Sequence, residues 1–167
     1  MSDKWYAFEE SIKVPLIIKD PRMPAAQHGT TNGEFTLSVD LAPTILSAAN
    51  IEVPVVMQGR DIAPLYMKPE PAAAAWRKDF FYEWTQGKNG EPHVGNNIPP
   101  VFALIQKAYK YIYWPVPKYE QIYNYAQDPF EEYDIFNDTA QTNLQLLLDM
   151  RARYAYLKNI SQKGFPV

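Results

Sequence analysis

The sequence contains no cysteine, which excludes disulfide bonds and thiolate metal sites. It also lacks an excess of positive charge, since 16 Lys and Arg residues stand against 19 Asp and Glu residues and the formal net charge is −3. The sequence has no cluster of Lys and Arg residues of the kind that binds a phosphate backbone, so nucleic-acid binding is not expected. No apolar run approaches the roughly 18 residues that cross a bilayer, and we therefore expect no membrane span.

Glycine is scarce, with 7 residues, whereas proline occurs 15 times and is the more frequent of the two residues that interrupt helices and strands. This balance favours strands and extended connectors over tight glycine turns. Hydrophobic residues make up 47 % and charged residues 21 %, which is normal for a globular protein and argues against disorder. The 167 residues suffice for one ordinary domain or for two small pieces that share a core.

The first residues, MSDKWYAFEESIK, are too acidic and too poor in apolar side chains for a signal peptide. This favours either a cytoplasmic protein or a chain that lacks its true beginning. A continuous apolar run at 14–18 predicts a buried strand of a parallel sheet. Residues 41–49 predict a helix, with Asp40 as N-cap and Asn50 as the left-handed residue after its end. One strand and one helix cannot complete a parallel sheet, so the pattern predicts a fragment.

The second half of the chain has a different pattern. Alternating residues predict strands at 79–84, at 119–125, and twice within 103–114, around Lys107-Ala108. We expect these runs to form an antiparallel sheet of three or four strands. Residues 142–158 predict an amphipathic helix that covers one face of the sheet. Its stripe consists of Leu144, Leu147, Leu148, Arg151, Tyr154 and Leu157. We place a boundary near 67–76 and predict domains at 1–67 and 76–167.

Motif logic finds no complete active site in this chain. The histidines, His28 and His93, lie in different loops, and no HExxH, EF-hand, GxSxG or glycine-rich phosphate loop occurs. The acidic run DPFEEYD at 128–134 is interpreted as a turn followed by a solvated face rather than as a calcium site. Lys4 remains, because its compact ammonium suits a tetrahedral oxyanion, although an exposed N-terminal lysine is the simpler interpretation.

The stretch DKWYAFEESIKVPLIIKDPR resembles a segment of the formylglycine-dependent sulfatases. The matching positions are Lys4, Phe8, Glu9, Glu10, Ser11, Ile12, Lys13 and Pro15. A second stretch, VDLAPTILSAANIEVPVVMQGRDIAPL, resembles the helix after DLxPT and the MQG connector of that family. Its matching positions are Asp40, Leu41, Pro43, Thr44, Gln58 and Gly59. WRKDFFYE, KYIYW and YNYAQDPFEEYD are similar to its C-terminal subdomain, so the resemblance runs through nearly the whole chain in the family's order.

The resemblance implies an α/β fold, with the end of an alkaline-phosphatase-like domain followed by a small antiparallel sheet and a packed C-terminal helix, together an α+β fragment. It also implies a parent enzyme that uses formylglycine and calcium. Formylglycine arises from Cys or Ser in a C/S-x-P-S-R motif, which this sequence does not contain. We therefore expect no cofactor on this chain. We expect the chain to be the last third of a sulfatase and to be inactive alone.

Site residues follow from the same resemblance. It implies that Lys4 binds the sulfate group and stabilises the departing oxygen. Trp5 and Tyr6 are candidate substrate contacts, with packing as the alternative, and aromatic rings suit stacking on a sugar face. His93 is a further candidate contact, with an exposed loop histidine as the alternative. Glu9 and Glu10 are expected to brace the segment.

At three positions the sequence departs from the family pattern. Lys13 stands where the family usually has Arg, which keeps the charge but loses the bidentate fork. Ile105 stands where many relatives have Arg, so a different specificity follows if that Arg binds substrate. Asn124 stands where the family has Asp, which we interpret as a structural change.

Three functions stay open at this point. The first is a sulfatase parent acting on sulfate esters, with a sulfated carbohydrate as the expected substrate. The second is a non-catalytic module that binds a glycan or a protein, and the third is a phosphodiesterase of the same superfamily. Exposed edges of the N-terminal strand and helix predict self-association. The localisation is left unknown, although a sulfatase parent is compatible with export to the periplasm or beyond the cell.

Overall fold

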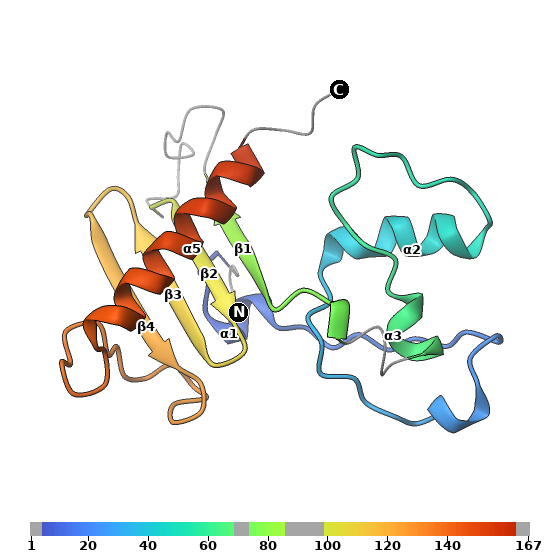
Figure 1. Cartoon of the computed structure of the whole chain (residues 1–167), viewed down its shortest axis with the longest axis horizontal. Coiled ribbons are helices and arrows are strands. Elements are labelled where there is room, and N and C mark those ends of the chain that lie inside the picture. The colour runs from blue at the N-terminus through green and yellow to red at the C-terminus, as the bar shows by residue number, and fades with distance from the viewer. Residues whose placement is uncertain (1–4, 69–73, 86–98, 163–167) are drawn as a thin grey trace. The chain divides into compact units, whose positions relative to one another are not determined.

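The computed structural model describes residues 5–68, 74–85 and 99–162 (Figure 1). These residues form two compact units. The sheet unit contains residues 5–15 together with the chain from Asp79 onward, and the helical unit contains Leu16–Lys78. Residues 5–15 thus pack with the second half of the chain, although the sequence analysis grouped them with the first. The domain boundaries at 1–67 and 76–167 stay a prediction.

Four antiparallel strands build the sheet in the order β1-β2-β3-β4. Their bounds are Asp79–Trp84, Val101–Gln106, Tyr109–Trp114 and Tyr119–Asn124. In the register Tyr111 lies opposite Leu104 on one side and Ile122 on the other. All the strands predicted for the second half of the chain are confirmed by these bounds.

Helix α5, Leu144–Gln162, crosses one face of this sheet (Figure 1). The side chain of Asn143 accepts the N–H of Leu146 at 2.9 Å and so starts the helix. Met150 and Tyr154 are buried against the sheet in the main apolar core. The predicted helix is confirmed, but its predicted stripe is wrong at Leu144 and Leu148, which are 70 % and 48 % exposed. Met150 was not included in that stripe, yet it is buried against the sheet. The rotation of α5 about its axis that buries Met150 directs both leucines toward solvent.

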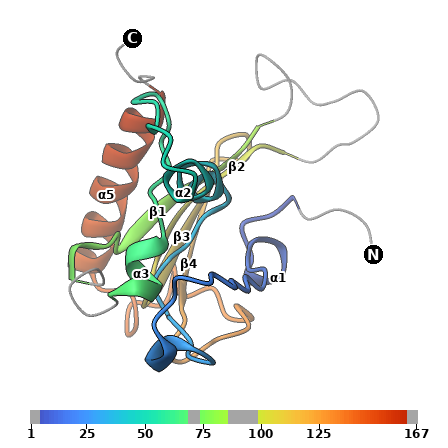
Figure 2. The same ribbon diagram turned by 90° about the vertical axis from the view of Figure 1, so that its right-hand side faces the viewer.

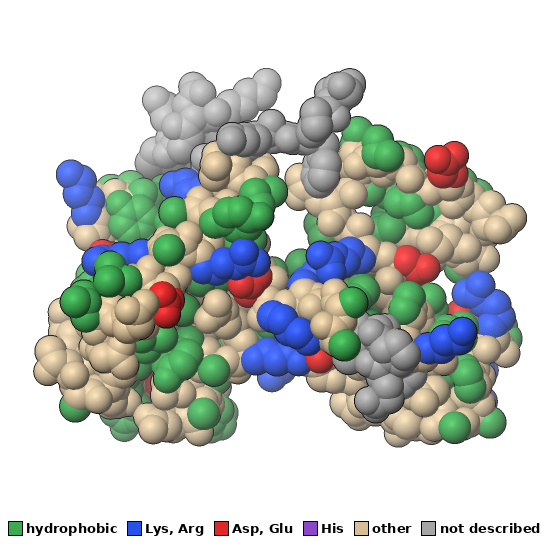
Figure 3. Space-filling model, viewed as in Figure 1, with side chains coloured by type: hydrophobic (Ala, Val, Ile, Leu, Met, Phe, Trp, Pro, Cys, Tyr) green, Lys and Arg blue, Asp and Glu red, His purple; other side chains and the backbone are tan. Residues whose placement is uncertain are grey.

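The strand predicted at 14–18 is wrong. These residues form no strand, and the side chains of Val14 and Ile17 are 63 % and 92 % exposed. A strand needs a hydrogen-bonded neighbour, and the four described strands pair only with one another. The strand edge that was expected to drive self-association is thus not formed. Hydrophobic side chains do reach the surface of both units (Figure 3), and self-association stays a prediction.

The helical unit contains short elements. These are α2 at Leu41–Ala48, α3 at Ala63–Met67, and 3-10 turns at Ala25–Gln27 and Ser38–Asp40. The helix predicted at 41–49 is confirmed, and it ends as expected with Asn50 at a φ of 57°. The apolar core of this unit is small and consists of Ile62, Leu65 and Trp76. In the described part of the chain, no helix has both the length and the apolar character that crossing a membrane requires.

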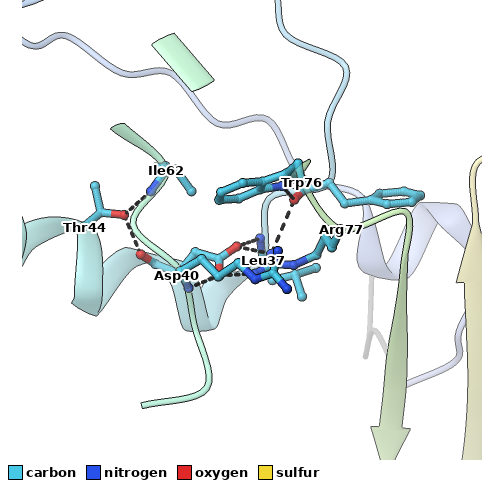
Figure 4. Close-up of polar contacts among 8 residues, drawn as sticks. Leu37, Asp40, Thr44, Ile62, Trp76 and Arg77 are labelled. Carbon is cyan, nitrogen blue, oxygen red and sulfur yellow. Dashed lines mark hydrogen bonds and ion pairs between the residues drawn. The ribbon is translucent and has the colours of Figure 1, made fainter. Parts of the chain in front are cut away.

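Asp40 is the polar centre of the helical unit (Figure 4). Its carboxylate is fully buried and makes a bidentate ion pair with Arg77, with Nη2 at 2.7 Å from Oδ1. It also accepts the backbone N–H groups of Leu37 at 2.7 Å and Arg60 at 2.8 Å. Burial alone would raise the pKa of Asp40, but the hydrogen bonds from Arg77 and from these N–H groups lower it below its ordinary value. Asp40 therefore holds distant segments together and makes no side-chain cap bond to α2.

The backbone around Asp40 is packed closely. Thr44 Oγ1 donates to the Asp40 carbonyl oxygen at 2.6 Å and accepts the N–H of Ile62 at 3.0 Å. A Cβ atom added at Gly59 would lie 1.8 Å from the carbonyl oxygen of Val39. Glycine is thus required at position 59 because another stretch of backbone passes against it.

Gly59→Ala should destabilise the chain by about 3 kcal/mol, since the added methyl meets rigid backbone rather than a movable side chain. Urea denaturation of the whole chain measures this loss. Gly33→Ala is the matched control, because a Cβ there meets nothing within 4 Å. The control should stay within about 0.5 kcal/mol of the wild type. Equal stabilities for the two variants would contradict the close approach.

Asp40 also predicts a signed dependence of stability on pH. Its pKa is lower in the folded chain than in the unfolded chain. The stability it contributes is therefore present above the unfolded pKa of about 3.9 and is lost as the pH falls through the folded pKa. Asp40→Asn should cost about 3 kcal/mol at neutral pH, because it leaves Arg77 without its partner.

On acidification below about pH 4, this variant should lose less further stability than the wild type loses. Urea denaturation at neutral and at acid pH measures both losses. Glu120, whose pKa is also lowered, remains in the variant, so the acid loss should shrink without vanishing. An acid loss as large as that of the wild type would count against this role of Asp40.

Candidate functional site

The segment that follows Lys4 lies on the sheet face opposite α5. Figure 2 shows the sheet between α5 on one side and α1 on the other. Helix α1 is a single turn, Glu9–Ile12. Ala7, directly before it, is fully buried. The sheet thus has a second covering layer, which is made by residues 5–12 rather than by a second long helix.

Aromatic side chains fasten this segment to the sheet. Rings from the segment meet rings on β1, β3 and β4 on that face, with centroid distances of 5.2, 5.5 and 5.9 Å. The pairs are Trp5 with Trp84, Tyr6 with Trp114, and Phe8 with Tyr123. Edge-to-face and tilted geometries of this kind add about 0.5–1.5 kcal/mol per pair beyond burial. All three aromatic residues of the segment therefore pack on the aromatic face of the sheet.

A hydrogen bond fixes the backbone at the start of the segment. The hydroxyl of Tyr82 donates to the carbonyl oxygen of Trp5 at 3.1 Å. Burial raises the pKa of Tyr82, which keeps the hydroxyl protonated and able to donate. The backbone that leads to Lys4 is thus attached to β1 one residue after the lysine.

Lys110 forms the polar centre of the same face. Its side chain on β3 is 0 % exposed, and its ammonium lies 3.2 Å from Glu9 Oε1 and 2.7 Å from Glu131 Oε1. The ammonium also lies over the ring of Tyr125, 5.1 Å from its centroid. A buried ammonium requires such partners, because an uncompensated charge in the interior is very costly. Lys110 therefore ties α1 and the loop after β4 to the sheet.

Tyr125 and the backbone of α1 complete the cluster. The Tyr125 hydroxyl lies 3.0 Å from Glu9 Oε1 and 3.4 Å from Glu131 Oε1. Burial, and then the charges of Glu131 and Glu9, raise the pKa of Tyr125 well above its ordinary value, so the phenol donates. The backbone N–H of Glu9 donates to Glu131 Oε2 at 2.6 Å. We call Glu9, Lys110, Tyr125 and Glu131 the Lys110 cluster.

The acidic run at 128–134 is structural, and its interpretation as a solvated face is wrong for three of its residues. Asp128 accepts the N–H groups of residues 132 and 133, Asp134 accepts those of residues 122 and 136, and Glu131 belongs to the Lys110 cluster. Glu131 has a φ of 57°, in the left-handed region. A non-glycine residue there carries strain that the surrounding contacts must offset. Phe130, Glu132 and Tyr133 of this run are exposed.

The sequence-predicted site residues are only partly placed. Lys4 and His93 lie outside the described residues. Trp5 is half-buried, and its indole N–H is buried without an acceptor in the described structure. Tyr6 is 37 % exposed, so one side of its ring remains accessible. Trp5 and Tyr6 thus pack against the sheet. Their role in substrate binding stays a prediction.

Glu9 braces the segment as the sequence analysis expected, whereas Glu10 is exposed. Lys110, Tyr125 and Glu131 were not predicted as site residues. One signal could have found Lys110, since it alternates with Ile112 and Trp114 on a strand whose other residues are apolar or aromatic. Ile105, the position of an Arg in many relatives, is 1 % exposed and pairs with Lys110 across β2 and β3.

Comparison with known proteins places the chain among sulfatases. Residues 1–158 match the family described as N-sulphoglucosamine sulphohydrolase, C-terminal. An N-acetylglucosamine-6-O-sulfatase of Bacteroides thetaiotaomicron is 30 % identical over 160 residues, which cover 91 % of this chain and 27 % of the relative. An ulvan-active sulfatase of Formosa agariphila is 26 % identical over 148 residues, which cover 89 % and 27 %. The chain spans about a quarter of the length of these relatives.

Solved structures share the fold. A protein in complex with its substrate D-glucosamine-2-N,6-O-disulfate matches at a TM-score of 0.57 and 22 % identity, covering 74 % of this chain and 25 % of that one. A phosphonate monoester hydrolase of Silicibacter pomeroyi matches at 0.57 and 20 %, covering 78 % and 26 %. These likenesses confirm the predicted fold class, the small antiparallel sheet and C-terminal helix of alkaline-phosphatase-like enzymes. Since the family match takes in residues 1–158, the chain belongs to the N-sulphoglucosamine sulphohydrolase C-terminal family of the sulfatases.

Proposed function

We propose that this chain is the C-terminal part of a sulfatase that hydrolyses sulfate esters of carbohydrates. The observation that carries the proposal is the family match over residues 1–158, together with the relative that is 30 % identical over 91 % of the chain. That relative is named an N-acetylglucosamine-6-O-sulfatase, so a 6-sulfated amino sugar is the first substrate to test. The chain supplies a sulfate-binding lysine and a substrate-contacting surface.

Lys4 is the proposed sulfate ligand. An ammonium near the ester neutralises the charge of the sulfate and the charge that develops on the departing sugar oxygen when the ester bond breaks. In the overall reaction the S–O bond to the sugar oxygen breaks and one water is consumed, whose oxygen ends on the sulfur and whose proton ends on the sugar oxygen, so that the products are the free hydroxyl and inorganic sulfate. The support from the structure is indirect: the residues after Lys4 are fastened to the sheet by rings and by the Tyr82 hydroxyl. A fixed attachment lowers the entropy that the lysine loses when it binds sulfate.

Calcium and formylglycine are the groups that the family resemblance implies. The sequence has no cysteine and no C/S-x-P-S-R segment. Within residues 5–68, 74–85 and 99–162, no group of three His, Asp or Glu side chains could hold a metal ion. The described residues therefore do not fit either group, and we derive no step of the reaction through calcium or formylglycine from this chain.

A second candidate is an esterase of the same superfamily that acts on phosphorus. The phosphonate monoester hydrolase with a TM-score of 0.57 shares the fold, and a multifunctional alkaline phosphatase superfamily protein of Trinickia caryophylli is 35 % identical over 78 residues. Assays that compare sulfate, phosphate diester and phosphonate ester substrates separate the two. A non-catalytic glycan- or protein-binding module is the third candidate, and it predicts glycan binding without turnover of any of these esters.

Lys4→Ala tests the proposed function in the full gene product that contains this chain. We expect a loss of at least about a hundredfold in kcat/KM for N-acetylglucosamine 6-sulfate, since one preorganised charge at the reacting group is typically worth this much. Lys13→Ala is the matched control, because the Lys13 side chain is 80 % exposed and pairs with Glu9 only at 3.7 Å. The control should retain nearly full turnover. Turnover by Lys4→Ala at the level of the control would overturn the role of Lys4.

Trp5, Tyr6 and His93 are proposed to contact the carbohydrate rather than the sulfate. Tyr6→Ala and His93→Ala should therefore raise KM for the sulfated sugar several-fold while leaving the turnover of 4-nitrophenyl sulfate, which has no sugar, nearly unchanged. Trp5→Ala and Tyr6→Ala also remove packing on Trp84 and Trp114 and should lower stability, so turnover is compared at a temperature at which all variants are folded. Tyr133→Ala, at a tyrosine that is 70 % exposed, serves as the control. Equal losses on both substrates would contradict contact with the sugar.

A further inference from the structure

We propose that Lys110 is a positioning residue for sulfate-ester hydrolysis, because the Lys110 cluster fixes residues 5–12, which directly follow Lys4 in the chain. The inference rests on the proposed function of Lys4. It adds a residue that is more than a hundred positions from Lys4 in the sequence. Lys110 is the first residue of the KYIYW stretch, and the family resemblance gave it no role. The ligand class is unchanged, namely the sulfate group of a sulfated carbohydrate.

The contacts of the segment show where its position is decided. The rings of Trp5, Tyr6 and Phe8 rest on the sheet, but stacked rings can slide along an aromatic surface. Charged hydrogen bonds are short and directional, so they fix the register. Within the described part of the segment, two such contacts converge on Glu9. Its carboxylate pairs with Lys110 Nζ at 3.2 Å, and its backbone N–H donates to Glu131 Oε2 at 2.6 Å.

Lys110 acts through the segment and does not touch substrate. Its side chain is 0 % exposed, and that of Glu131 is 1 % exposed, so neither reaches a solute in this structure. Glu9 is closer to the surface than Lys110 and Glu131, with a side chain that is 24 % exposed. The chain from Glu9 back to Trp5 is held at both ends, by the cluster and by the hydroxyl of Tyr82.

A contribution to stability alone explains the Lys110 cluster poorly. The other sheet face is covered by α5, and its ion pairs, Arg151 with Glu120 and Arg153 with Asp79, lie at the partly exposed rim rather than in the interior. A buried ion cluster is often no more stabilising than apolar side chains of similar volume. What it adds is a single allowed arrangement of the groups that it joins. The group joined here is the segment next to the proposed sulfate ligand.

A double-mutant cycle in the full gene product tests this inference. Lys110→Met should lower kcat/KM for the sulfated sugar by about ten- to a hundredfold, since a small displacement of a catalytic group costs this much. In the Lys4→Ala background, the same change should cost less than about threefold, because there is no longer a lysine to position. Arg153→Met is the matched control, since it removes an ion pair from the opposite face of the same sheet. All variants are compared at a temperature at which they are equally folded.

Each outcome decides the matter. If the loss from Lys110→Met is as large without Lys4 as with it, or no larger than that from Arg153→Met, the positioning role is overturned while the proposed function stands. If Lys4→Ala keeps its turnover, the proposed function and this inference fail together. If Lys110→Met does not fold, Glu9→Gln replaces it in the same cycle, because it leaves the Lys110–Glu131 pair intact. Glu9→Gln should then show about a tenfold loss that disappears in the Lys4→Ala background.

Discussion

The buried ammonium of Lys110 is the constraint on which the sheet unit depends. A charge with no exposed surface must find its compensation inside the protein, and here the partners come from two places far apart in sequence, Glu9 and Glu131. Satisfying Lys110 therefore brings a short N-terminal turn and the loop after β4 onto one face of the sheet. Because Glu131 accepts the backbone N–H of Glu9 as well, the two partners also fix each other. The strained backbone at Glu131 is offset by these contacts.

The helical unit is organised by a buried charge of the opposite sign. Asp40, fully buried, gathers Arg77 and the backbone of Leu37 and Arg60 around a small apolar core. The residues that carry the sulfatase resemblance in this unit, such as Asp40, Thr44 and Gly59, are thus explained by packing and hydrogen bonding. In the sheet unit the first motif residue, Lys4, lies outside the described residues, and the residues that follow it are anchored on the sheet. The chemical role proposed for Lys4 therefore rests on the family resemblance.

Much of the fold follows from the sequence, and the exceptions have physical causes. The four strands, α2 and α5 follow from residue alternation and helical spacing, which are local signals. The strand at 14–18 was wrong because pairing depends on neighbours that a local pattern does not contain. The role of the acidic run was missed because its partner, Lys110, is distant in sequence. For the candidate site, the family pattern led to Lys4, Trp5 and Tyr6. Only the three-dimensional contacts revealed Lys110 and Tyr125, which meet each other and Glu9 in the Lys110 cluster.

The central claim is that the Lys110 cluster holds residues 5–12 on the sheet so that Lys4 meets a sulfate group. A crystal structure of the full gene product with inorganic sulfate or a sulfated sugar bound tests this most directly. The account predicts that Lys4 Nζ lies within about 3 Å of a sulfate oxygen while Glu9, Lys110 and Glu131 keep the contacts described above. A sulfate group bound without Lys4, or with residues 5–12 lifted from the sheet, would contradict it.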